Sequence, residues 1–179
     1  MSSKIGVQNI AHTNGTNAMT VSASGVTTFT SVPINAGGGK VLQVVNSITT
    51  TASATFTASG PHAILTATIT PSSTSSKIFI TASGSCQLTS GSNGTFASDM
   101  FRGSISGTLI SRYYEGVGGT TNNAIAYHTP SHSVIDSPST TNATTYTFSI
   151  AKGSGGTQSV RTIGSAAHPI VMCLMEIGG

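Results

Sequence analysis

Apolar residues alternate with hydroxyl residues along several short segments of this 179-residue chain. Residues 63–70 read AILTATIT, and residues 144–150 read TTYTFSI. A period of two places alternate side chains on opposite faces of a β-strand, so each such strand has one apolar face and one polar face. No segment shows the 3.6-residue period of an amphipathic helix. The alternation therefore predicts an all-β protein.

Hydroxyl groups take the place of charges in this chain. Ser and Thr make up about a third of the residues, only 6% are charged, and Trp is absent. Disordered chains are usually rich in charge and poor in β-branched apolar residues, whereas Val, Ile, Thr and Phe recur here at strand-like spacing. The length accommodates one ordinary domain and a short arm. We therefore expect a single folded β domain.

The chain separates into an opening segment, residues 1–39, and a head, residues 40–179. The opening is rich in Gly, Asn and Thr, and residues 18–21 and 26–29 predict a short hairpin around a Ser-Gly turn. We expect this arm to need a neighbour to order it. Three consecutive glycines, Gly37 to Gly39, predict a flexible joint before the head.

Strands in the head are predicted wherever an alternating or apolar run is bounded by Gly, Pro, Ser or Asn. Their spacing is typical of an antiparallel β-sandwich, jelly-roll-like in form. Residues 71–76 form a turn-rich run, so we expect residues 63–70 and 77–82 to pair as an antiparallel hairpin. The last run, residues 170–175, is apolar on both faces, which indicates either a central strand or a strand packed against other subunits. Further strands are expected at 41–45, 94–102, 108–114, 123–128, 134–136, 144–150 and 160–163.

The net charge of +3 comes from single, scattered basic residues, so we expect no nucleic-acid binding. No run is long enough to cross a bilayer, and the opening residues lack the apolar stretch of a signal peptide, so we expect folding in the cytosol without membrane insertion. In that compartment Cys86 and Cys173 are expected to be free thiols. So few charges leave sheet edges unprotected, which favours a homo-oligomer.

Enzymatic chemistry has few candidate groups. Asp99, Glu115, Asp136 and Glu176 are the only acids, so a two-carboxylate site is improbable and we expect no enzyme and no cofactor. The GGGK run at 37–40 lacks the earlier glycine and the following hydroxyl of a phosphate loop. His128 and His132 have a helical metal spacing, but Pro130 lies between them and we expect no metal. One histidine per subunit on a three-fold axis is the remaining route to a metal site.

Tyrosines, an arginine and a histidine gather in two neighbouring segments and form the candidate ligand-binding set. Tyr offers a rigid apolar face with a polar tip, which suits sugars and proteins. Ordinary sheet packing is the alternative, and it has the higher base rate. The set is Arg112, Tyr113, Tyr114, Tyr127 and His128.

The order of several motifs resembles modules of tail-fibre-like and other structural proteins of marine and cyanobacterial phages. The resemblance covers most of the chain from residue 39 onward, and the opening from residues 5–9 to Phe29 is similar to the segment that precedes such modules. The motifs in the head are GKVLQVV at 39–45, LTATITPSSTSSKI at 65–78, FRGS at 101–104, IDSP at 135–138 before TTYTF at 144–148, and MEI at 175–177.

The resemblance implies a trimerising β-sandwich or jelly-roll head whose N-terminal part joins the virus particle. The chain has no extended shaft, so the resemblance implies a short fibre, a spike or a capsid-decoration protein. Such a protein would be present in the virion and assembled in the host cytoplasm. Its partners would be copies of itself and other capsid or tail proteins. A glycan- or receptor-binding adhesion module is the second hypothesis, and a tail-spike glycosidase is the third. The docking residues would be Ile5, Val7, Met19, Val21 and Phe29.

Overall fold

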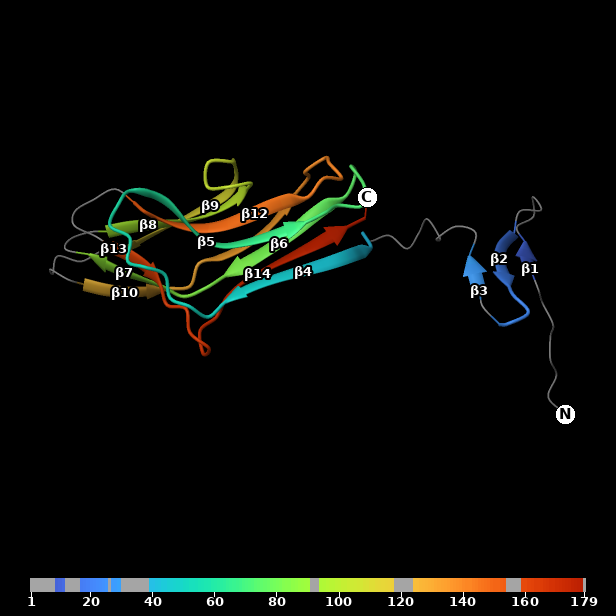
Figure 1. Cartoon of the computed structure of the whole chain (residues 1–179), viewed down its shortest axis with the longest axis horizontal. Helices are drawn as coiled ribbons and strands as arrows, with labels where there is room; N and C mark the ends of the chain where they lie inside the picture. The colour runs from blue at the N-terminus through green and yellow to red at the C-terminus, as the bar shows by residue number, and fades with distance from the viewer. Residues whose placement is uncertain are drawn as a thin grey trace. The chain divides into compact units, whose positions relative to one another are not determined.

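The computed structural model divides the chain into two compact units, residues 1–38 and 39–179 (Figure 1). The structure describes residues 9–11, 17–25, 27–29, 39–90, 94–117, 124–153 and 159–178. Ile5 and Val7, two of the predicted docking residues, lie outside these ranges.

The first unit holds a three-stranded antiparallel sheet in the order β1 (Asn9–Ala11), β2 (Asn17–Val21), β3 (Thr27–Phe29). Met19 lies opposite Phe29 and Val21 opposite Thr27, which confirms the predicted hairpin. Gly25 closes the turn: its amide donates to the Ser22 carbonyl at 2.9 Å. Its φ of +79° is a conformation that glycine adopts without steric cost.

The second unit, the head, is a sandwich of two four-stranded antiparallel sheets, β11-β6-β14-β4 and β5-β12-β8-β9. Each strand of these two sheets falls where the sequence predicted one, whereas β7 of a third, short sheet was not predicted. The bounds are β4 (Val41–Thr49), β5 (Gly60–Ile69), β6 (Lys77–Ser83), β7 (Cys86–Ser90), β8 (Gly94–Arg102), β9 (Thr108–Val117), β10 (Ala124–His128), β11 (Ser131–Asp136), β12 (Thr144–Lys152), β13 (Ser159–Thr162) and β14 (Ile170–Ile177).

The strand pairing is nested, which makes the sandwich a jelly roll. Among the eight strands of the two four-stranded sheets, the first pairs with the last (β4 with β14), the second with the seventh (β5 with β12), the third with the sixth (β6 with β11), and the fourth with the fifth (β8 with β9). This arrangement is that of a double-sheet jelly roll. The short sheet β10-β7-β13 repeats the order β11-β6-β14 and extends it beyond a break in the strands. The predicted fold is confirmed.

The predicted hairpin between residues 63–70 and 77–82 is wrong. β5 pairs with β12, whereas β6 pairs with β11 and β14, so the two strands belong to opposite sheets. Both strands turn apolar side chains into one core, β5 from one side and β6 from the other. The connection at 70–76 therefore bridges the two layers, which lie about 10 Å apart in such sandwiches. A polar turn between two alternating runs is compatible with either arrangement.

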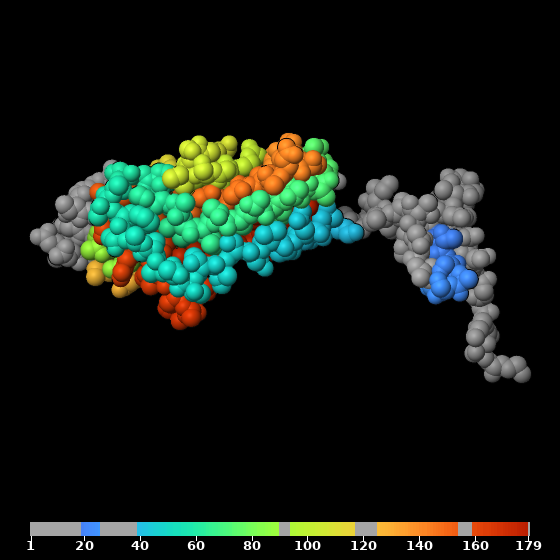
Figure 2. Space-filling model, viewed as in Figure 1, coloured from blue at the N-terminus to red at the C-terminus, as the bar shows by residue number. Residues whose placement is uncertain are grey.

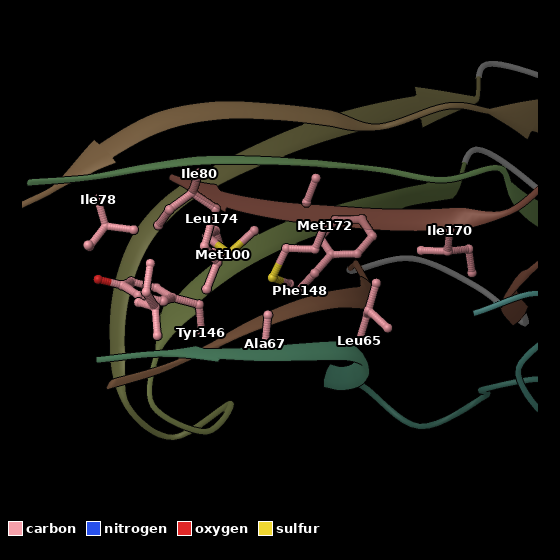
Figure 3. Packing of buried hydrophobic residues seen from close by; sticks show 12 residues of the cluster. Leu65, Ala67, Ile78, Ile80, Met100, Tyr146, Phe148, Ile170, Met172 and Leu174 are labelled. Atoms are coloured by element: carbon pink, nitrogen blue, oxygen red, sulfur yellow. The ribbon is translucent and has the colours of Figure 1, made fainter. Parts of the chain in front are cut away.

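The main core lies between the two sheets (Figure 3). Ile78, Ile80 and Leu174 from one sheet face Tyr146 and Phe148 from the other, and all five are fully buried. A second cluster continues the core toward the short sheet; it contains Cys86, Leu88, Phe96, Ile150 and Val160.

The last strand, β14, lies between β6 and β4, so the expectation of a central strand is confirmed. Cys86 in β7 and Cys173 in β14 are both free thiols, as predicted. Within the described ranges there is no helix, and hence none long and apolar enough to cross a membrane.

Candidate ligand-binding groove

A groove of about 580 Å³ lies on the outer face of the β5-β12-β8-β9 sheet. Two small residues at a cross-strand pair, Ala97 of β8 and Ala151 of β12, form part of its floor. Arg112 and Tyr114 of β9 line it from one edge strand, and Ser59 to Pro61 line it at the start of the other, β5. Its size is within the range of small-molecule sites in proteins.

Arg112 is fixed in the groove by the fully buried carboxylate of Asp99. Arg112 Nε donates to Asp99 Oδ1 at 2.6 Å, and Nη2 donates to Oδ2 at 2.9 Å. This forked pairing is the strongest arrangement between a guanidinium and a carboxylate. The hydrogen bond to Asp99 raises the pKa of Arg112, so the guanidinium stays charged. The pair is neutral as a unit, and it holds the Arg112 side chain across the sheet.

Tyr114 gives the groove an aromatic wall. The Arg112 guanidinium carbon lies 5.7 Å from the centroid of the Tyr114 ring, and Nη1 donates to the phenol oxygen at 3.4 Å. Tyr114 remains 69% exposed, so ring surface is available to a ligand. Lys152 adds a cation whose Nζ donates to the Thr57 carbonyl at 3.2 Å. An aromatic wall beside fixed cations suits a sugar ring with polar or acidic substituents.

The structure brings only two of the five predicted ligand residues together. Arg112 and Tyr114 are in the groove, but Tyr113 points to the other face of β9, where its ring lies 4.7 Å from that of His132. Tyr127 and His128 are on β10, in the short sheet. His128 Nδ1 contacts the carboxylate of Glu115, and the His128 ring lies 5.0 Å from that of Phe96. Strand alternation explains why Tyr113 is separated from Arg112 and Tyr114 on the same strand, since adjacent residues point to opposite faces.

His132 was expected to be an ordinary loop histidine rather than a metal ligand, but it lies buried in strand β11. It extends from β11 across the sandwich, where Nδ1 hydrogen-bonds to Ser111 Oγ at 2.6 Å and Nε2 to Ser98 Oγ at 3.1 Å. Burial lowers its pKa, outweighing the opposite effect of Asp99, so the neutral ring is favoured. It joins the two sheets through a satisfied polar contact. In the described part of the chain, no cluster of three or more potential metal ligands is present.

Two clusters of polar side chains bring together residues from sequence motifs that are far apart in the chain. In the first, the buried Glu176 accepts hydrogen bonds from Ser72 N at 2.7 Å, from Ser72 Oγ at 2.6 Å and from Gln43 Nε2 at 2.6 Å. Burial alone would raise the pKa of Glu176, but these hydrogen bonds outweigh it and lower the pKa to about 2. The cluster joins the first strand of the head, the connection between β5 and β6, and the last strand.

In the second cluster, Asp136 is held by Arg102 and by the buried Tyr146. Tyr146 Oη donates to Asp136 Oδ2 at 2.8 Å, and Arg102 Nη1 approaches the same oxygen at 3.2 Å. Burial, followed by this hydrogen bond, raises the pKa of Tyr146, so the phenol keeps its proton. The three residues come from β8, β11 and β12, which links both sheets at one end of the sandwich.

No protein-family model and no curated protein matches the chain. Among solved structures, the chain is similar to one titled as the structure of infectious bursal disease virus Gx strain, at 14% identity and a TM-score of 0.41, covering 78% of this chain and 33% of that chain. A Gt-strain structure of the same virus matches at 11% identity and 0.40, covering 91% and 47%. A crystal structure of the T13 IBDV viral particle matches at 14% and 0.36, covering 79% and 36%. This chain thus spans between a third and a half of those chains.

The groove has no sequence signal beyond Arg112 and Tyr114. Its floor and far wall are small or backbone groups contributed by strands distant in the sequence, and only the pairing of β8 with β12 brings Ala97 next to Ala151. Nothing in the local sequence around either alanine differs from an ordinary strand. Chemically, the groove can bind and orient a ligand.

Proposed function

We propose that this chain is a non-enzymatic structural protein of a bacteriophage particle, displayed on the particle surface as a homotrimeric short fibre, spike or capsid-decoration protein. Jelly rolls occur in viral capsids, lectins and cupins, so the fold alone does not choose among these roles. The observation that carries the proposal is that the motifs resembling phage structural modules meet in the two polar clusters. Gln43, Ser72 and Glu176 form one, and Arg102, Asp136 and Tyr146 form the other.

The state of the acids supports the non-enzymatic part of the proposal. Asp99 is paired with Arg112, Asp136 with Arg102, and Glu115 with His128, while Glu176 is held by neutral donors. The chain has four acids in all, so each is engaged in holding the head together. An acid or base that takes part in turnover needs access to a substrate.

The direction of the chain through the head supports docking by residues 1–39. The head starts and ends at the same end, where the Gly178 amide donates to the Lys40 carbonyl at 2.8 Å. The short sheet β10-β7-β13 lies at the opposite end of the sandwich (Figure 1). We propose that the arm attaches to the particle, with Met19, Val21 and Phe29 among its contacts, and that the short-sheet end projects.

The test is incorporation into particles. The full chain is compared with a chain lacking residues 1–38, which leaves the head with its own core and both polar clusters intact. We expect the shortened protein to be folded by circular dichroism but missing from purified particles. Incorporation of the shortened protein at the level of the full chain would contradict arm docking.

A second candidate function, glycan or receptor binding during host adsorption, is favoured by the groove. The expected ligand contact is Tyr114, and Tyr127 provides a matched control because the two rings are 69% and 68% exposed. Stacking on one aromatic ring contributes roughly 1 kcal/mol or more. We therefore expect Tyr114→Ala to weaken adsorption several-fold and Tyr127→Ala to leave it unchanged. Equal behaviour of the two variants would remove the groove from host recognition.

A further inference from the structure

The outer face of the β11-β6-β14-β4 sheet carries an apolar row that crosses all four strands. Ile135 lies opposite Phe79, Phe79 opposite Met175, and Met175 opposite Val44. Ile135 is 61% exposed and Val44 is 51% exposed, while the two central side chains are half-buried. A second apolar pair, Val171 opposite Ile48, lies farther along the same face. The register of the sheet, rather than any local run, creates this surface.

The same face has almost no charge to keep it in water. The row next to the apolar one consists of Ser133, Thr81, Cys173 and Asn46. Among the described residues of these four strands, the only charged side chain on this face is Lys77, at the rim beside Ile177. The uncovered face of an antiparallel sheet is normally polar, so an uncharged face with an apolar row is typical of a contact surface.

We infer that this face is covered by a second copy of the chain, which rests on the homo-oligomeric part of the proposed function. An uncharged face gains no ion pairs from a charged partner, so the matching surface must also be uncharged. Another copy of the chain offers such a surface, because the chain has few charges and all four of its acids are engaged internally. A contact between copies therefore buries the apolar row without burying an unpaired charge.

The area is adequate for such a contact. Four strands about 4.8 Å apart and about seven residues long cover roughly 450 Å² as a flat projection, or about 900 Å² for two copies. The accessible surface of a ridged sheet exceeds its projection, which brings the face close to the lower limit of stable interfaces, about 1,200 Å². The exposed Val41 and Leu42 extend the apolar surface along β4, the edge strand that runs at the surface of the head (Figure 2).

The test is the mass of the full chain in solution, measured by light scattering over a range of concentrations, for wild type and for the double variant Ile135→Lys, Val44→Lys. Both side chains are more than half exposed, so the lysines fit the folded head. The matched control is Ile125→Lys on β10, which is 54% exposed but lies beyond the break in the sheet. Circular dichroism verifies that all three proteins are folded.

We expect wild type and the control to form the same oligomer. The double variant should dissociate to 17.9 kDa, with association at least a hundredfold weaker than that of wild type. The reason is that burying unpaired charges strongly opposes association. If the double variant keeps the wild-type mass, this interface is wrong and the oligomeric proposal stands. A wild type that remains at 17.9 kDa overturns the inference together with self-association in solution. Incorporation into particles tests the virion role separately.

Discussion

Each acid of the chain is held by a partner inside the head, and Glu176 shows what this does for stability. Its carboxylate accepts hydrogen bonds from Ser72 and Gln43, which lowers its pKa to about 2 from 4.5. The folded pKa lies below the unfolded one, so the charged form stabilises the head above about pH 4.5. That contribution is lost as the pH falls from about 4.5 through 2.

We expect Glu176→Gln to lower the free energy of unfolding by about 2 to 3 kcal/mol at pH 7, because the amide nitrogen faces donors that need an acceptor. The deficit should shrink by more than half at pH 3, where the wild-type contribution is fading. Urea unfolding at the two pH values measures both numbers. A deficit that is the same at pH 3 and pH 7 would mean that the loss does not depend on the charge of Glu176.

At the residue scale, Arg112 and Tyr114 could be predicted as ligand contacts because aromatic and hydrogen-bonding side chains gather in their segment, and Tyr offers an apolar face with a polar tip. The sequence alone could not separate Tyr113 from Tyr114, since that requires knowing which face of β9 is buried. His132 was discounted as a metal ligand because Pro130 breaks the helical spacing, but no local pattern indicated that Ser98 and Ser111 would form hydrogen bonds with it. Contacts between sheets depend on pairing that local patterns do not contain.

The hairpin between β8 and β9 is the innermost pair of the jelly roll, and its turn is tightly packed. A Cβ built on Gly107 would lie 2.2 Å from the Arg102 carbonyl oxygen and 3.0 Å from that of Ser104. A methyl group cannot be accommodated there without moving the backbone, because the obstructing atoms are main chain. Farther along β9, a Cβ on Gly116 would meet its nearest neighbour at 3.7 Å, an ordinary contact.

We expect Gly107→Ala to destabilise the head by about 2 kcal/mol or more, and Gly116→Ala to change stability by less than about 0.5 kcal/mol. Thermal or urea unfolding of the two variants measures the difference. Equal effects of both substitutions would show that the turn relaxes around the added methyl group and does not fix the hairpin.

At the scale of elements, strand positions were predictable because period-two alternation and turn residues are local properties. Strand pairing was not: β5 and β6 have apolar faces and a polar connection, which fit a hairpin and a crossing between layers equally well. The nested order becomes visible only when β4 is found beside β14, at the opposite end of the sequence. Adjacent strands in the sequence are the usual pairs, and a jelly roll departs from that usual arrangement at each crossing.

At the scale of the whole molecule, low charge predicted an oligomer before any surface was known. The structure shows an apolar row that suits such a contact, because sheet register aligns Ile135, Phe79, Met175 and Val44 from four separate strands. The groove lies on the other sheet of the sandwich, so the two surfaces do not compete. A particle protein that associates through one sheet can therefore present the other to a ligand.

The most direct measurement of the central claim is the amount of the full chain in purified particles of the virus that encodes it, determined by quantitative mass spectrometry against a known capsid protein. The account predicts a fixed copy number that is a multiple of three and survives a high-salt wash, since the proposed contacts are apolar rather than ionic. Recovery of the chain only in the soluble fraction of infected cells, with none in the particles, would contradict it.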